Sequence, residues 1–127
     1  MGFLNSLEDI LGIDDRPVVE FEVPEWNTSV RLRGMTGTDR DAFEAHVTKG
    51  GQEGTMNIIG MRAKMVAACM VNENGERIVS PMEESKLGQK SAAALDRVFT
   101  KCMELNGMSA EDKEALEENF GATGSEQ

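Results

Sequence analysis

A long apolar segment, Met56 to Val79, constrains the fold of this chain more than any other part of the sequence. Its first part, roughly 56–70, carries apolar residues at helical spacings of three and four, which predicts a helix. A turn at Asn72–Gly75 and a strand-like exit at Ile78–Val79 follow it. The charged residues within the helix are Arg62 and Lys64. A helix this apolar must be covered on most sides, either by the rest of the chain or by a partner protein.

The first residues of the chain predict a short amphipathic helix, which Gly12 ends. Its apolar face consists of Phe3, Leu4, Leu7, Ile10 and Leu11. A helix of this length is marginal in water, so it either docks on another surface or frays. We therefore treat residues 1–13 as an N-terminal arm, residues 14–119 as a single domain and residues 120–127 as a flexible polar tail.

A change from helical to alternating periodicity after residue 17 predicts a β-hairpin. Apolar residues alternate with glutamates at 19–23 and with arginines at 30–33, which gives each strand one apolar and one charged face. We expect the register to place Glu20 and Glu22 opposite Arg31 and Arg33, since this arrangement pairs opposite charges across the strands.

A capping signal predicts a helix after the hairpin. Thr38 precedes an acidic first turn, and the helix ends at Lys49–Gly51, before a glycine-rich loop. Its inward-facing residues are expected to be Ala42, Phe43 and Val47.

Two further helices have clear boundaries. Residues 80–83 form a capping box with proline at the first helical position, and the short helix that they start ends at Gly88. Ser91 caps a longer helix, which Asn106-Gly107 ends. The apolar face of this longer helix consists of Ala92, Leu95, Val98, Phe99, Cys102 and Leu105. The expected fold is α+β: a mostly α-helical single domain with an N-terminal β-hairpin.

The end of the chain is acidic. A last helix is expected from Ser109 to about Asn119, followed by residues too polar to bury anything. Residues 109–127 hold six acidic residues against one lysine, a net charge of −5, which is half of the total of −10. This segment is either a solvated end that keeps the protein soluble or an electrostatic handle for a basic partner.

Charge and apolar patterning limit the classes of partner. A net charge of −10 argues against binding a nucleic-acid backbone, whose phosphates require lysine and arginine. No segment approaches the roughly 20 apolar residues of a membrane span, and the N-terminus lacks the pattern of a secretory leader. We expect a cytosolic protein whose macromolecular partners are other proteins, including copies of itself.

The sequence predicts no catalytic, cofactor or metal site. His46 is the only histidine, and no nucleophile motif surrounds it. Cys69 and Cys102 are interpreted as buried, reduced thiols. With a single histidine they do not complete a zinc site. The glycine-rich residues 50–55 lack the lysine and hydroxyl that end a phosphate-binding loop. We therefore expect a protein that is not an enzyme.

An interaction surface remains as the functional hypothesis. Four of the nine methionines cluster on the central apolar helix: Met56, Met61, Met65 and Met70. Flexible thioether side chains suit both irregular cores and surfaces that adapt to partners. Trp26, in the hairpin connection, is either a plug for the core or an anchor for a partner. The candidate partner-binding residues are Trp26, Met61, Met65 and Met70, and we expect at least one of these three methionines to be more than half exposed.

The order of these signals resembles one protein family. The first strand leads into Pro24–Trp26, and the second strand Val30–Arg33 and the helix start Thr38–Glu44 follow. The later segments that carry the resemblance are Arg62–Lys64, Cys69–Arg77, Leu87–Val98 and Leu105–Met108. Over about residues 14–119, this order and spacing is similar to that of the tail assembly chaperones of long-tailed bacteriophages.

The resemblance implies a non-enzymatic protein of the host bacterial cytoplasm that is absent from the finished virion. Such proteins bind and solubilise the tape measure protein, a long helical chain, until tail tube subunits polymerise around it. The tail tube protein and a longer frameshift product are further partners that the family suggests. Two alternatives stay open from the sequence: a structural component of the virion, in the tail or connector, and an acidic regulator of a host protein.

Overall fold

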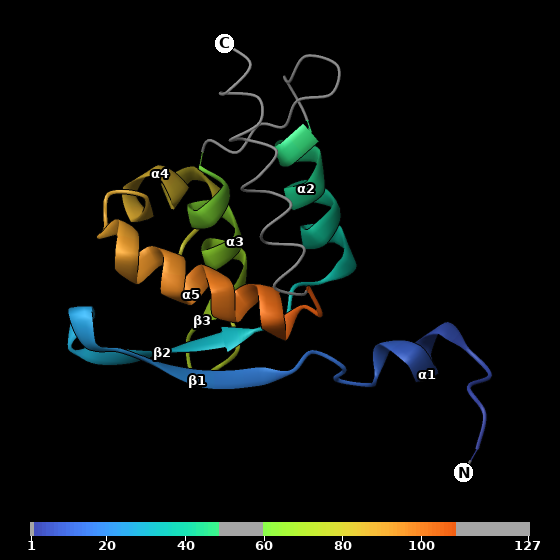
Figure 1. Cartoon of the computed structure of the whole chain (residues 1–127). Helices are drawn as coiled ribbons and strands as arrows, with labels where there is room; N and C mark the ends of the chain where they lie inside the picture. The colour runs from blue at the N-terminus through green and yellow to red at the C-terminus, as the bar shows by residue number, and fades with distance from the viewer. Residues whose placement is uncertain (1, 49–59, 109–127) are drawn as a thin grey trace.

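The computed structural model describes residues 2–48 and 60–108 of the chain (Figure 1). In chain order its elements are α1 (Leu7–Leu11), β1 (Val18–Val23), η1 (Pro24–Trp26), β2 (Thr28–Arg33), α2 (Gly37–Thr48), α3 (Met61–Cys69), β3 (Met70–Val71), η2 (Pro81–Glu83), α4 (Glu84–Leu87) and α5 (Ala92–Leu105). The strands form an antiparallel sheet in the order β1-β2-β3. Figure 1 shows helices α2 to α5 on one side of this sheet. The expected α+β fold with an N-terminal hairpin is confirmed.

The hairpin register is only partly the predicted one. Glu20 lies opposite Arg31, and their side chains form an ion pair at 3.6 Å. Glu22 lies opposite Ser29 instead of an arginine, so the second charge pair that we expected is wrong. The physical reason is the connection, a 3₁₀ turn that closes on Asn27 in the left-handed conformation. This turn sets the strand pairing regardless of charge.

The central helix α3 is shorter than predicted. It begins at Met61, after Gly60 with a φ of 72°, and it ends at Cys69. The predicted helical residues 56–59 lie outside the described residues. Seven of the nine residues of α3 are buried. The rest of the chain therefore covers this helix.

The residues after α3 form the third strand. Met70 and Val71 belong to β3 and not to the last helical turn, because they pair with β2. The turn at Asn72–Gly75 forms as predicted, with a φ of 82° at Gly75. The strand-like exit expected at Ile78–Val79 is wrong, since the bridge to the sheet falls one residue earlier, between Arg77 and Val71.

The core lies between the sheet and the helices. Outside α3 and β3 its buried residues are Val23, Leu32, Phe43, Val47, Ala94, Leu95, Val98, Phe99, Cys102 and Met103. Phe43 and Val47 face inward from α2 as predicted. Two alanines that were expected inside are exposed, Ala42 on α2 and Ala92 in the first turn of α5. Ala42 and Ala92 lie on the solvent side of their helices, whereas Ala94 of α5 faces the core.

Side-chain caps start α2, η2 and α5, although the cap of α2 is displaced. The hydroxyl of Thr36, and not that of Thr38, accepts the backbone N–H of Asp39 at 3.0 Å, so α2 starts earlier than predicted. Residues 80–83 form the predicted capping box. The predicted cap of α5 is also present, because Ser91 Oγ accepts the N–H of Ala94 at 3.3 Å.

Asn106 closes the C-terminal end of α5. Gly107 follows it with a φ of 76°, and Met108 N–H donates to Met103 O at 2.8 Å, as in a Schellman motif. The Asn106 side chain accepts the N–H of Met35 at 2.7 Å and donates to Cys102 O at 2.7 Å. It therefore joins the end of α5 to the segment that leaves β2.

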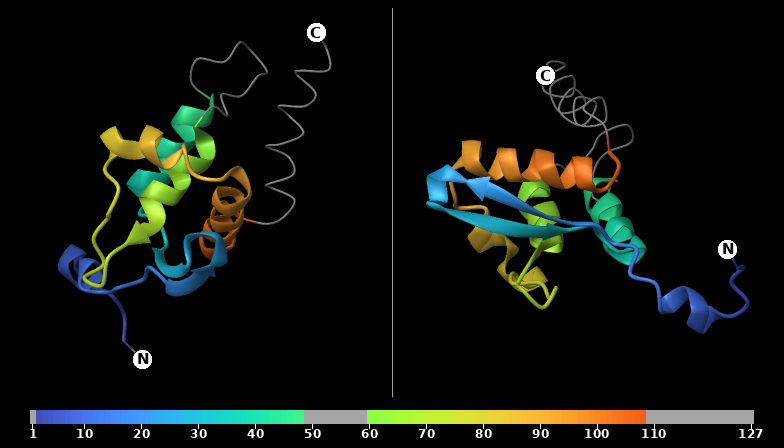
Figure 2. Two further views of the ribbon diagram at one scale, coloured as in Figure 1. Left: turned by 90° about the vertical axis from the view of Figure 1, so that its left-hand side faces the viewer. Right: turned by 90° about the horizontal axis from the view of Figure 1, so that it is seen from below.

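The N-terminal arm leaves the domain. In Figures 1 and 2, α1 extends away from the sheet and the helices. Two contacts tie the preceding linker to the end of β2: Arg33 pairs with Asp14 at 3.1 Å, and Arg16 Nε donates to Gly34 O at 2.7 Å. The arm therefore starts from a defined place on the domain.

Candidate interaction surfaces

The methionines of the central helix are core residues. Met61 is 1% exposed, Met65 0% and Met70 4%, so the expectation that one of them would be more than half exposed is wrong. The cause is that α5 and α2 pack against α3, which buries Met61 and Met65. Met70 follows the helix in β3, where it pairs with β2. A partner that binds this conformation does not reach Met61 or Met65, and only 4% of Met70 is exposed to it. Met56 lies outside the described residues.

Trp26 is partly buried and packs against the core from η1. Its indole Nε1 is hidden from solvent and has no acceptor among the described residues. This position agrees with the interpretation of Trp26 as a plug of the hairpin end. Its role as a partner anchor stays a prediction.

The arm carries six of the nine large apolar residues that are exposed in the described part of the chain. Six large apolar residues there are between 51% and 91% exposed: Phe3, Leu4, Leu7, Ile10, Leu11 and Ile13. The sequence predicted the helix but did not place it among the candidate sites. The signal that identifies it is the polar linker Asp14–Arg16, which separates the apolar face of the arm from the domain.

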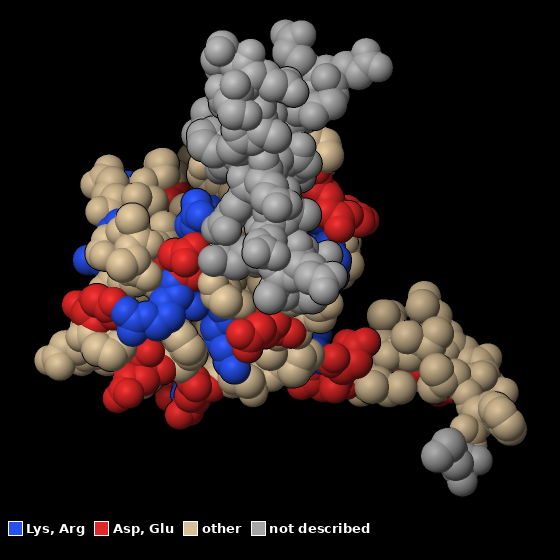
Figure 3. Space-filling model, viewed as in Figure 1, with Lys and Arg blue, Asp and Glu red and all other residues tan. Residues whose placement is uncertain are grey.

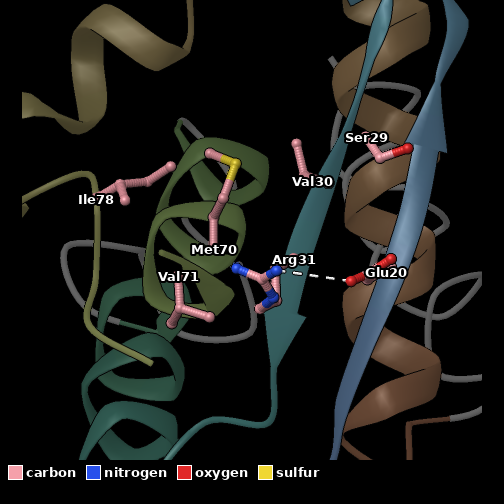
Figure 4. Close-up of a pocket in the computed structure, with 7 residues that line it drawn as sticks. All are labelled: Glu20, Ser29, Val30, Arg31, Met70, Val71 and Ile78. Carbon is pink, nitrogen blue, oxygen red and sulfur yellow. Dashed lines mark ion pairs between the residues drawn. The ribbon is translucent and has the colours of Figure 1, made fainter. Parts of the chain in front are cut away.

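A groove opens beside the middle strand, where β3 is too short to pair with all of β2 (Figure 4). It encloses about 330 Å³ and is lined by Glu20, Ser29, Val30, Arg31, Met70, Val71 and Ile78. We call it the β2 groove. Met70 and Val71 are buried, whereas Ile78 is 52% exposed. The guanidinium of Arg31 lies between this apolar side and Glu20 in Figure 4. The β2 groove thus combines apolar walls with a charged rim.

Charge is distributed unevenly along the chain. Residues 1–15 hold four acidic residues and no basic one, a net charge of −4. Residues 16–108 hold 13 acidic and 12 basic residues, and so carry only −1. Figure 3 shows the two signs interleaved on the domain. Most of the −10 net charge therefore belongs to the two ends of the chain.

The two cysteines lie side by side in the core, as free and buried thiols. The pKa of Cys69 is lowered, chiefly because its sulfur accepts a hydrogen bond from the Cys102 thiol, and burial opposes this shift. Donating that hydrogen bond, together with burial, raises the pKa of Cys102. The expectation of buried thiols is confirmed.

Groups of three or more potential metal ligands do not occur among residues 2–48 and 60–108. His46 is partly buried on α2. Within the same residues, no helix is long and apolar enough to cross a membrane. On the surface of the described residues, we take the arm and the β2 groove as the candidate interaction sites.

These features define a class of protein: a small α+β domain whose helices lie on one side of an antiparallel sheet and whose N-terminal arm is exposed. No protein-family model matches the sequence, and no curated protein does so. Among solved structures, the fold is similar to that of the tail assembly chaperone of bacteriophage HK97, with a TM-score of 0.59 and 15% sequence identity. The match covers 78% of this chain and 91% of the HK97 chain. The resemblance seen in the sequence motifs is therefore confirmed at the level of the fold.

Proposed function

We propose that this protein is a phage tail assembly chaperone that binds and solubilises the tape measure protein before the tail tube polymerises. The observation that carries the proposal is the fold shared with the HK97 tail assembly chaperone over 91% of that chain. The order of motifs along residues 14–119 supports it independently, because it is a property of the sequence and not of the fold.

The physical properties of the chain suit this role. A long chain with apolar stripes aggregates before assembly unless other molecules cover it. A small acidic protein with exposed apolar residues can cover such stripes and keep the complex soluble. We take the protein to be non-enzymatic and to act in the host cytoplasm, outside the mature virion. The tail tube protein and a longer frameshift product are further candidate partners.

Self-association is part of the proposal. Modest affinity for each stretch of the tape measure protein suffices if adjacent copies also contact one another, because each bound copy then raises the effective concentration of the next. Many copies would thus coat one long chain.

Co-expression tests the function. With this protein present, the tape measure protein of the same phage is expected in the soluble fraction and in a co-purifying complex. An unrelated aggregation-prone protein, expressed in the same way, serves as the control for specificity. Unchanged solubility together with the absence of a complex contradicts the proposal. Detection of the chain in purified particles supports the alternative of a structural virion component.

A further inference from the structure

Among residues 2–48 and 60–108, the arm packs on no apolar surface. Six of its large apolar side chains are more than half exposed, and α1 extends away from the domain in both Figure 1 and Figure 2. Asp14 and Arg16 hold the linker at the end of β2, which directs the arm outward. Exposed apolar residues grouped in this way are typical of a surface that another molecule covers.

The β2 groove has the properties of a receptor for such residues. Its volume of about 330 Å³ lies at the lower end of the ~300–1,000 Å³ found for pockets that bury small ligands, so it can take a few apolar side chains. Met70 and Val71 line it with apolar surface, and Ile78 is half exposed at its side. It is open because β3 pairs with β2 only at Arg31 and Leu32.

Charge favours the arm as the occupant. Residues 1–15 carry −4 without a basic residue, and Glu8 and Asp9 lie within α1 itself. Arg31 lines the groove, and its ion pair with Glu20 is long, at 3.6 Å, and partly exposed. A carboxylate of an incoming arm can therefore reach Arg31 in place of Glu20 at little cost.

We infer that the arm of one copy docks in the β2 groove of a second copy. This inference rests on the self-association proposed above and assigns it to particular residues. The two surfaces are different, so the contact is heterologous and leaves a free arm at one end and a free groove at the other. Repetition of the contact builds an open row of copies, which matches the need to cover a long chain.

Direct pairing of two exposed β1 edges is a less favourable contact. Gly34 N–H donates a hydrogen bond to Pro17 O, which fixes which residues of β1 bond to β2. In this register the backbone N–H and C=O groups of Val18, Glu20 and Glu22 point away from β2. Two copies that joined along this edge would bring glutamate rows of like charge together.

Matched substitutions to aspartate test the inference. Leu7→Asp changes the arm, Ile78→Asp changes the groove, and Met82→Asp is the control, since Met82 is 92% exposed and does not line the groove. Analytical ultracentrifugation of the full chain should show concentration-dependent association. We expect the first two variants to weaken self-association roughly tenfold or more, because each removes one apolar side chain that the contact buries. Met82→Asp should leave self-association unchanged.

Circular dichroism checks the fold of each variant. Ser29→Trp, which fills the groove from an exposed position, replaces Ile78→Asp if the latter does not fold.

Mixing the two defective variants distinguishes the possible geometries. Leu7→Asp keeps an intact groove and Ile78→Asp keeps an intact arm, so an equimolar mixture should form heterodimers that do not grow further. A mixture without heterodimers, or variants that associate like the wild type, overturns the inference and leaves tape measure binding untouched. A wild-type protein that is monomeric at all concentrations contradicts both the inference and the proposed self-association. Failure to bind the tape measure protein, with association intact, contradicts the proposed function alone.

Discussion

The central helix α3 and the N-terminal arm have similar sequence patterns and opposite environments. Both carry apolar residues at helical spacing. Met65 in α3 is completely buried, whereas Leu7 in the arm is 64% exposed. The sheet, α2 and α5 enclose α3, while the polar linker carries the arm away from them (Figures 1 and 2). Periodicity thus identifies an apolar face, but it does not identify the surface that covers it.

The largest expected change in the free energy of unfolding comes from a substitution in the buried helix α3. Met65→Ala should lower the free energy of unfolding by about 2–5 kcal/mol, because the shortened side chain leaves a cavity in the core. Urea denaturation followed by circular dichroism measures this loss. Met82→Ala, at a fully exposed methionine, should change the free energy of unfolding by less than about 0.5 kcal/mol. Equal effects of the two substitutions would contradict the core position of α3.

A smaller effect is expected where α5 closes the core. Asn106→Ala removes two short side-chain hydrogen bonds and leaves the N–H of Met35 without its acceptor, so the free energy of unfolding should fall by about 1–3 kcal/mol. Asn5→Ala is the matched change in the arm, where the side chain donates only to Phe3 O at 3.2 Å on the surface. It should be nearly neutral. A neutral result for Asn106→Ala would show that the joint between α5 and the segment after β2 does not stabilise the domain.

The smallest effect is expected from removal of the arm. Deletion of residues 2–13 should change the free energy of unfolding by less than about 0.5 kcal/mol, because none of these residues is buried. Measurement at low protein concentration separates this stability from self-association. A loss of more than about 1 kcal/mol in the monomer would mean that the arm packs on its own domain, and the contrast with α3 would no longer hold.

Local signals predicted much of the fold. The caps at Ser80 and Ser91 and the end of α5 at Gly107 are where the sequence placed them. They were predictable because the interacting atoms lie within one helical turn of each other. The cap of α2 was misplaced because two threonines, Thr36 and Thr38, lie close enough to the helix start to cap it. The sequence does not distinguish between them.

The candidate site was the less predictable part. The central methionines were interpreted as a possible partner surface, and the structure places three of them in the core. The β2 groove was not predicted at all, because it depends on the length of β3 and on the position of Ile78 beside a strand more than 40 residues earlier in the chain. The arm was predicted as a helix, but its exposure depends on how the linker is held by Arg33.

The sequence by itself determined the hairpin and the helices, the caps at Ser80 and Ser91, and the concentration of negative charge at both ends of the chain. These properties depend on neighbouring residues and on composition. Only the tertiary structure decided the strand register, the burial of Met61, Met65 and Met70, and the exposure of the arm. The physical reason is that burial is a property of two surfaces that meet. A sequence pattern describes one of those surfaces at a time.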